Sequence, residues 1–372
     1  MKLLLPTAFY LISCVLVVFS QMLTYLLLRA RKPTGSRPKI IIEAGERGWR
    51  SIELKELYQS AREYLGDESV LRLVVDRNVS YRQQVKRVLA ANADVTHYLY
   101  DPRTGRAEDK QNLWNALTDS VSMALLLRRY SVTPVILLTD IGYRYWRYQA
   151  AAVSAQAGVV VSFMSSKLSR AIFPHSRLIG PSIFPMSQAT LCYLTDLRKT
   201  LEEERRIEKK VRFTGSLYEP RASFMKEFER LLGPAADIRG RELGTARKSD
   251  AEYWQLIASA AIVITTADHF DQPGADLKHV QYMVYRYLEV LACGSLLLAP
   301  AVPGVMNYFT PGIHFVPFES VQDAHDKAVY YLEANEQADR IRLEGQRRAK
   351  ALIESRVFWL QINAALGPKG FF

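Results

Sequence analysis

Short apolar runs alternate with longer amphipathic stretches along most of this chain. The apolar runs have the length of buried strands, and the stretches between them have the length and apolar spacing of helices. In the first half the expected strands are residues 40–42, 71–75, 96–100, 134–138 and 159–163. Strands that alternate with helices predict the α/β class, in which parallel sheets carry helices on both faces.

The same pattern predicts helices in the first half at residues 52–64, 81–91, 113–129 and 143–157. It restarts in the second half with strands at 211–214 and 261–265 and a helix from about residue 220 to 232. Ser249 and Glu252 form a candidate capping box for another helix. A strand at 313–317 and helices from Ser320 and near Glu336 follow.

The length allows two domains, because 372 residues that are 49% hydrophobic can fill two separate cores. The expected parts are an anchor at 3–28, a basic linker at 29–38, a first domain at 39–200 and a second at 201–352. Residues 353–372 are expected to form a helix that could pack back on the first domain. The stretch 198–212 holds seven basic and four acidic residues and is interpreted as a solvated helix or an interdomain linker.

Residues 3–28 contain no charged side chain. As a helix they would measure roughly 39 Å, more than the roughly 30 Å of hydrocarbon in a bilayer. A cleaved signal peptide is the alternative, but its apolar region is usually shorter. Basic residues cluster after the run, so the sequence predicts a single-pass membrane protein whose body lies in the cytosol.

The formal net charge of +11 favours anionic partners such as phosphates, anionic lipid or nucleic acid. The three cysteines provide neither a disulfide framework nor a Cys-rich zinc site. The sequence contains no Asp-x-Asp pair, Walker A motif or G-x-G-x-x-G motif, and no closely spaced histidine pair. These absences disfavour metal-dependent hydrolases, P-loop kinases and nicotinamide dehydrogenases.

The segment 285–300 predicts a helix, a glycine cap and a buried strand. Gly294 is suited to the left-handed conformation that closes a helix, and the apolar run 295–299 follows it. Arg286 and Glu289 are three residues apart and therefore share one helix face. The pair could be a solvated ion pair or part of a ligand site.

This segment resembles the R-x-x-E-x-x-x-x-G box of GT-B glycosyltransferases, especially the group 1 subfamily related to spore-maturation glycosyltransferases. Arg286, Glu289 and Gly294 occupy the matching positions. The resemblance extends over residues 213–358 and implies two Rossmann-like domains that face a cleft. It implies that Glu289 accepts hydrogen bonds from the ribose of a nucleotide-sugar donor, with the acceptor bound mainly by the first domain.

The diphosphate of such a donor needs basic side chains and free backbone amides. Lys278, Arg286 and the backbone at Gly215 are expected to hold it, the site helix being expected to begin near residue 279 or 280. Arg221 is a further candidate, with an exposed helix residue as the alternative. The donor is expected to be a UDP- or GDP-sugar.

Retaining members of the larger superfamily often carry a glutamate eight residues before the ribose glutamate, where this chain has Gln281. The stereochemical outcome is therefore left open. An inverting enzyme of this fold draws its base from the first domain, and Asp140, Glu43 and Glu46 are candidates. Each of the three could equally have a structural role such as capping a helix.

The sequence thus predicts a metal-independent, cofactor-free glycosyltransferase that acts on a membrane-associated, lipid-linked or envelope glycan acceptor, with no nucleic acid as partner. Two alternatives remain. One is a catalytically silent GT-B scaffold that binds nucleotide sugar or a partner, and the other is a membrane-tethered basic nucleic-acid-binding protein.

Overall fold

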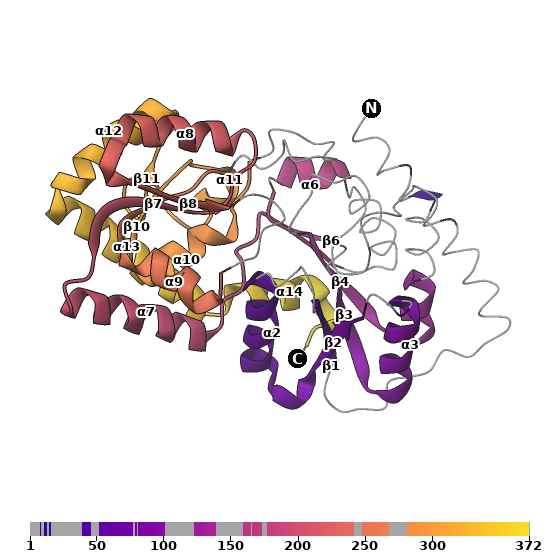
Figure 1. Cartoon of the computed structure of the whole chain (residues 1–372). Helices are drawn as coiled ribbons and strands as arrows, with labels where there is room; N and C mark the ends of the chain where they lie inside the picture. Colours follow the sequence, from indigo (N-terminus) through magenta and orange to yellow (C-terminus); the bar gives the residue numbers. More distant parts are fainter. Residues whose placement is uncertain are drawn as a thin grey trace. The chain divides into compact units, whose positions relative to one another are not determined.

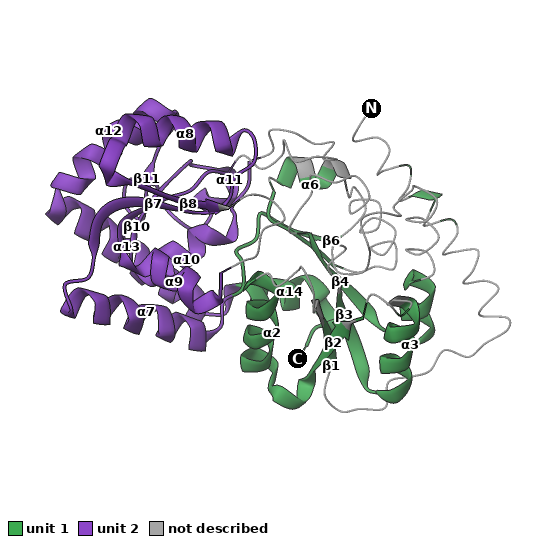
Figure 2. Ribbon diagram, viewed as in Figure 1, with its two compact units in different colours: residues 1–185, 358–372 green, residues 186–357 purple. Residues whose placement is uncertain are grey.

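The computed structural model describes residues 39–45, 52–76, 79, 81–100, 123–138, 159–164, 166–172, 177–241, 248–267 and 281–371, with four isolated positions near the amino terminus. The chain forms two compact units (Figure 2). Unit 1 comprises residues 1–185 and 358–372, and unit 2 comprises residues 186–357. The first boundary falls before the expected residue 200, because helix α7 (Gln188–Glu203) packs on helices of unit 2.

Unit 1 contains a six-stranded parallel sheet with the order β2-β1-β3-β4-β5-β6. Its strands are β1 (Lys39–Gly45), β2 (Val70–Val75), β3 (Val95–Tyr100), β4 (Thr133–Leu138), β5 (Val159–Ser162) and β6 (Arg177–Ile179). The first five confirm the strands predicted from apolar runs. Strand β6 was missed because it has only three residues, none of them fully buried.

The described helices of unit 1 are α2 (Ile52–Leu65), α3 (Tyr81–Ala91), α6 (Ser166–Ile172) and α14 (Val357–Leu366) (Figure 1). The carboxyl-terminal residues complete this unit. The Trp359 indole donates to the Ser60 hydroxyl at 3.1 Å, and the Nε2–H of His97 donates to the Lys369 carbonyl at 2.7 Å. Phe371 is 1% exposed and packs its ring edge-on against His97.

Unit 2 contains a five-stranded parallel sheet with the order β11-β10-β9-β7-β8. The strands are β7 (Glu208–Ser216), β8 (Ala236–Arg241), β9 (Ala260–Ile264), β10 (Leu296–Ala299) and β11 (Val316–Pro317). The helices besides α7 are α8 (Arg221–Leu232), α9 (Asp250–Ser259), α10 (Tyr285–Cys293), α11 (Pro303–Met306), α12 (Val321–Glu333) and α13 (Asn335–Glu354). Helices α8 and α12 cover one face around a core that includes Phe213 and Phe228, while α7, α9, α10 and α13 pack together on the other (Figure 1).

The charged stretch 198–212 is a solvated helix only in part. It comprises the end of α7, a connection at 204–207 and the first half of β7, and most of it is exposed, but two of its arginines are buried, Arg198 at 5% and Arg212 at 1% exposed. Arg212 pairs with Asp237 at 2.6 Å and with Glu208 at 2.8 Å. Such partners make burial possible, since an isolated charge in an apolar interior is costly.

Several predicted segments lie outside the described residues. These are the linker 29–38, the helix 143–157 and, apart from four isolated positions, the anchor 3–28; of the helix 113–129, residues 123–129 are described and are helical. In the part of the chain that the structure describes, no helix combines the length and the apolar character that crossing a membrane requires.

Candidate functional site

Helix α10 begins at the carboxyl edge of the unit 2 sheet, since it follows β9 and leads into β10. Its first residue is Tyr285, because Val284 is extended at φ −88° and ψ 155°, so the predicted start near residue 279 or 280 is wrong. Its end confirms the prediction: Gly294 adopts the left-handed conformation at φ 83° and ψ 21°. Arg286 is therefore the second residue of α10, Glu289 lies in the middle of the helix, and Gly294 closes its other end.

The carboxylate of Glu289 is buried, with 2% of the residue exposed. The Tyr253 hydroxyl donates to its Oε2 at 2.8 Å, and the Trp254 indole N–H donates to its Oε1 at 3.2 Å. Both donors come from the start of α9. The interpretation of Arg286 and Glu289 as a solvated ion pair is therefore wrong, because Glu289 is a buried acceptor held by two side chains.

The guanidinium of Arg286 is held at the end of β7. Its Nε donates to the Tyr253 hydroxyl at 3.1 Å, and its planar group lies over the rings of Phe213 at 5.5 Å and Tyr253 at 5.8 Å. Burial alone would lower the pKa of Arg286. The Tyr253 phenol and the Glu289 carboxylate raise it by more, so the net shift of the pKa is upward. The group is therefore a permanent cation.

Gly215 makes room for that guanidinium. It has φ +145°, and a Cβ at this position would stand 2.9 Å from both terminal nitrogens of Arg286. A side chain would thus displace Arg286 or strain the backbone, since L residues rarely adopt this φ. Gly215 is not a turn after the strand, since it lies within β7 beside Gly240, but it does meet the predicted arginine of α10 directly.

Arg221 is the first residue of α8 and is 6% exposed, so the alternative of an exposed helix residue is wrong. Its Nε donates to the Thr266 hydroxyl at 2.9 Å and its Nη1 to the Ser216 carbonyl at 3.2 Å, and it lies over the Tyr218 ring at 4.6 Å. Among the described residues it forms no ion pair. Burial lowers its pKa, and the nearby charge of Arg286 adds to that effect.

Two buried hydroxyls complete this edge of the sheet. Thr214 lies near the end of β7 and is 2% exposed, and Thr265 directly follows β9 and is 0% exposed. Neither hydroxyl has a hydrogen-bond partner among the residues that the structure describes. A buried hydroxyl without a hydrogen-bond partner costs about 1–3 kcal/mol of folding stability. This edge of the sheet therefore carries polar groups that packing alone does not explain.

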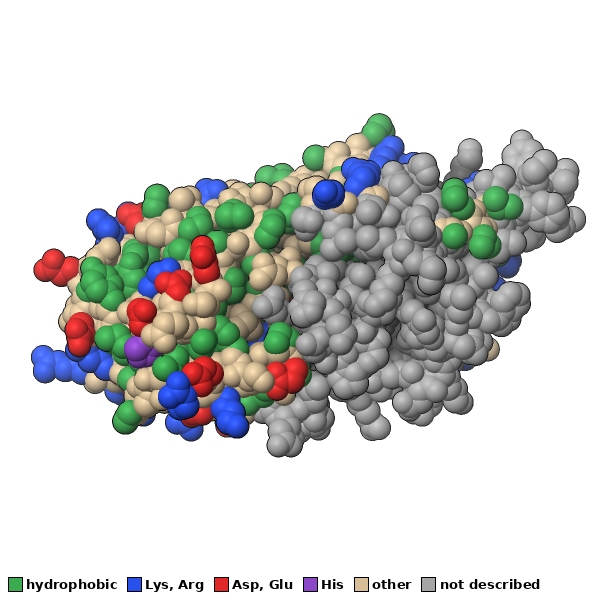
Figure 3. All heavy atoms as spheres, turned by 90° about the horizontal axis from the view of Figure 1, so that it is seen from above, with side chains coloured by type: hydrophobic (Ala, Val, Ile, Leu, Met, Phe, Trp, Pro, Cys, Tyr) green, Lys and Arg blue, Asp and Glu red, His purple; other side chains and the backbone are tan. Residues whose placement is uncertain are grey.

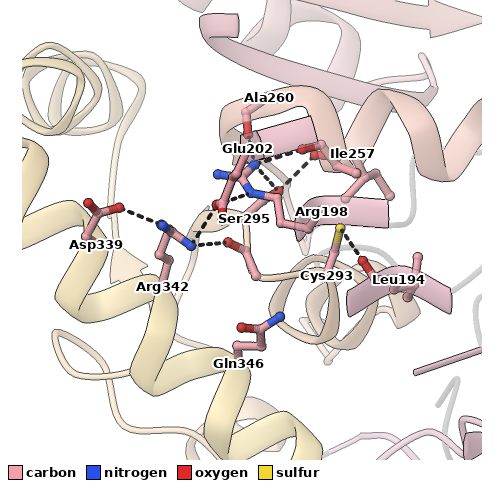
Figure 4. Close-up of polar contacts among 12 residues, drawn as sticks. Leu194, Arg198, Glu202, Ile257, Ala260, Cys293, Ser295, Asp339, Arg342 and Gln346 are labelled. Atoms are coloured by element: carbon pink, nitrogen blue, oxygen red, sulfur yellow. Dashed lines mark hydrogen bonds and ion pairs between the residues drawn. The ribbon is translucent and has the colours of Figure 1, made fainter. Parts of the chain in front are cut away.

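The opposite ends of α9 and α10 are joined by a buried arginine from α7 (Figure 4). Arg198 donates to the carbonyls of Ala258 and Ala260, each at 2.8 Å, and to the Ser295 hydroxyl at 3.2 Å. Its Nε donates to Glu202 at 2.8 Å. One guanidinium thus links the end of α9 to Ser295, the second residue after α10.

Helix α13 supports the same end of α10. Arg342 pairs with Glu202 at 3.2 Å (Figure 4) and donates to the Gly294 carbonyl at 3.4 Å. Gln346 donates to the Ala292 carbonyl at 3.4 Å. Cys293 lies beside them, and burial raises the pKa of its thiol to about 12. This cysteine is therefore an inert packing residue.

The structure brings together four of the predicted residues: Gly215, Arg221, Arg286 and Glu289. Lys278, Asp140 and Glu46 lie outside the described residues, and Glu43 lies in strand β1 beside Leu73. Sequence reasoning missed Tyr253 and Trp254 as site residues. Its one relevant signal was the Ser249–Glu252 capping box, which the structure confirms and which places both at the start of α9.

No described group of three or more His, Cys, Asp or Glu side chains could hold a metal ion. The chemical groups of the site are one buried carboxylate, two buried or half-buried guanidiniums and the glycine near the end of β7. They lie at the carboxyl ends of parallel strands, where ligands of open α/β sheets bind.

Residues 197–357 match a family described as glycosyl transferase-like. No curated protein matches the chain significantly. Among solved structures, HepE (Alr3699) of Anabaena in complex with UDP-glucose has a TM-score of 0.56 at 14% identity, with 89% of this chain and 99% of HepE covered.

Two further structures are similar. Sucrose-phosphate synthase from Thermosynechococcus elongatus has a TM-score of 0.56 at 12% identity, with 88% of this chain and 98% of the other covered. AviGT4, a glycosyltransferase involved in avilamycin A biosynthesis, has a TM-score of 0.52 at 11% identity, with 89% and 98% covered. The chain thus has the two parallel-sheet α/β domains of GT-B glycosyltransferases, and its residues 197–357 match the glycosyl transferase-like family.

Proposed function

We propose that this protein is a glycosyltransferase whose unit 2 binds a nucleotide-sugar donor, a UDP-sugar in the first instance. The observation that carries the proposal is the cluster at the end of β7, where Arg286 lies against Gly215, Arg221 and Arg286 both lie over the Phe213 ring, and the Tyr253 hydroxyl links Arg286 to the Glu289 carboxylate. The family match of residues 197–357 supports it. So does the likeness to HepE, which was solved with UDP and with UDP-glucose.

The two guanidiniums suit the diphosphate. The bond from the sugar to the diphosphate breaks during transfer, so the leaving group gains negative charge that fixed cations stabilise. Arg286 and Arg221 both lie over the Phe213 ring, at 5.5 Å and 5.9 Å. Two cations this close repel each other, and Arg221 has no carboxylate partner among the described residues. A bound diphosphate would relieve both costs.

The carboxylate suits the ribose. Each oxygen of an ionised carboxylate can accept about two hydrogen bonds. Tyr253 donates to one oxygen of the Glu289 carboxylate, and Trp254 donates to the other. A ribose would present two neighbouring hydroxyl donors, which are groups that a carboxylate accepts.

We also infer the cellular setting. A transmembrane helix at 3–28 would anchor the protein, with the body in the cytosol, which favours a lipid-linked or envelope glycan as acceptor. The absence of an Asp-x-Asp pair from the sequence favours transfer without a metal ion. Membership of the spore-maturation-related subfamily, Lys278 as a diphosphate ligand, and Asp140 or Glu43 as the base stay predictions.

The nucleic-acid alternative has little support. On the face seen in Figure 3, the Lys and Arg side chains at the left of the picture, over unit 2, alternate with Asp and Glu side chains. A nucleic-acid site is usually a concentrated basic surface. The silent scaffold stays open to test, since Gln281 stands where retaining enzymes often have glutamate.

The test is a thermal-shift and calorimetric titration of the purified protein with UDP, GDP and UDP-glucose, followed by an assay for release of UDP. We expect UDP to stabilise the wild type and to bind Glu289→Gln at least about 10-fold more weakly, which is about 1.4 kcal/mol. Glu227→Gln, an exposed glutamate paired with Arg230 on α8, is the control that should bind normally. Absence of binding by any nucleoside diphosphate would reject the proposal, and binding without turnover of any donor would favour the scaffold.

A further inference from the structure

One phenol hydroxyl joins the two ligand groups of α10. Tyr253 comes from α9, yet its hydroxyl contacts both Glu289 at 2.8 Å and Arg286 at 3.1 Å. We propose that Tyr253 is a positioning residue that couples the ribose-binding carboxylate to the diphosphate-binding guanidinium. This inference rests on the proposed function of the site.

The start of α9 places Tyr253 firmly. The Ser249 hydroxyl accepts from the Glu252 amide at 3.3 Å, and the Glu252 carboxylate accepts from the Ser249 amide at 2.9 Å. The Tyr253 amide donates to the Ser249 carbonyl at 2.9 Å. Because this capping box fixes the first turn, the phenol reaches α10 from a defined position.

The hydrogen-bond directions follow from the donors available. Arg286 Nε–H can only donate, so the Tyr253 hydroxyl accepts from it and must give its own proton to Glu289. Burial and the Glu289 charge raise the pKa of Tyr253, against the opposing effect of Arg286, so the phenol stays protonated across the working pH range. The chain of donors therefore runs one way, from arginine through tyrosine to glutamate.

This chain sets the orientation of both end groups. With Nε of Arg286 engaged by Tyr253, the two terminal nitrogens face Gly215, where the diphosphate is proposed to bind. With Oε2 of Glu289 engaged, and Oε1 engaged by Trp254, the carboxylate cannot rotate freely. Loss of one hydroxyl would release both groups, although the tyrosine itself need not contact the donor.

Tyr253→Phe tests the inference, because it keeps the ring under Arg286 and removes only the hydroxyl. The matched control is Tyr287→Phe on α10, whose hydroxyl donates to the Pro300 carbonyl at 2.8 Å, outside the site. UDP is the probe, with the dissociation constant measured by calorimetry and stability by thermal unfolding. We expect Tyr253→Phe to bind UDP about 10-fold more weakly and Tyr287→Phe to stay within about twofold, while both lose stability.

A double-mutant cycle separates positioning from a general effect on the fold. In the Glu289→Gln background, Tyr253→Phe should weaken UDP binding by clearly less than in the wild type, because the Glu289 contact is already altered and only the Arg286 contact remains to be lost. A full 10-fold loss in both backgrounds, or an unchanged affinity of the single variant, would overturn the inference. If the wild type binds UDP, only this inference has then failed; if the wild type binds no nucleoside diphosphate, the proposed function has failed.

Discussion

Arg198 is predicted to be the main polar support of the helices that carry the site. It is 5% exposed, and a single nitrogen donates to the carbonyls of Ala258 and Ala260, two residues that are 0% exposed. Arg198→Met keeps most of the side-chain volume and removes every donor. The Ser295 hydroxyl would still donate to the Ile257 carbonyl at 2.9 Å, so the loss falls on the two carbonyls.

The expected loss of unfolding free energy follows from the carbonyls of Ala258 and Ala260. Each buried carbonyl left without a partner costs about 1–3 kcal/mol, which gives about 2–6 kcal/mol for the pair. For a unit of this size, a loss of about 4 kcal/mol lowers the melting temperature by about 8–16 °C.

The assay is thermal and urea unfolding of the full chain, followed by circular dichroism. Lys199→Met, on the next residue of α7, is the control; Lys199 is exposed and pairs with Glu203 at 3.8 Å. It should change stability by less than about 0.5 kcal/mol. If Arg198→Met unfolds within about 2 °C of Lys199→Met, less than about 1 kcal/mol separates them and the assigned role is refuted.

Three further predictions concern single side chains. Burial lowers the pKa of His97, so as the pH falls the unfolded chain binds a proton before the folded chain does. The free energy of unfolding should therefore fall as the pH drops below about 6.5. His97→Gln should make the free energy of unfolding less dependent on pH in urea titrations from pH 5 to pH 8. Gly215→Ala should weaken UDP binding at least about 10-fold in calorimetry, whereas Gly233→Ala, also at positive φ but with open space around it, should cost stability alone. Thr265→Val should raise the free energy of unfolding by about 1 kcal/mol, because it removes a buried hydroxyl with no partner among the described residues; a loss of more than about 1 kcal/mol would mean that the hydroxyl is satisfied.

Local patterns predicted local structure well. The end of α10 at Gly294 and the capping box of α9 depend on residues within one turn of each other, and both were predicted from sequence. Buried strands were found for the same reason, since an apolar run is itself the signal. Strand β6 lacks that signal because its three residues are at best half-buried.

Contacts between distant residues could not be predicted. Tyr253 and Glu289 are 36 positions apart, and Arg198 is 60 positions from the Ala258 carbonyl that it holds. Composition favoured a solvated Arg198 and an exposed Arg221, because charged side chains are seldom buried without partners. Their partners are backbone carbonyls and hydroxyls, which any sequence offers and which only the packing of the helices selects.

The central claim is that Glu289, Arg286 and the backbone at Gly215 bind a nucleotide-sugar donor. A crystal structure of the protein with UDP tests it most directly. The account predicts the ribose hydroxyls within hydrogen-bond distance of the Glu289 carboxylate and the diphosphate between Gly215 and the terminal nitrogens of Arg286. UDP bound at another place, with Tyr253 and Trp254 the nearest donors to Glu289 as before, would contradict it.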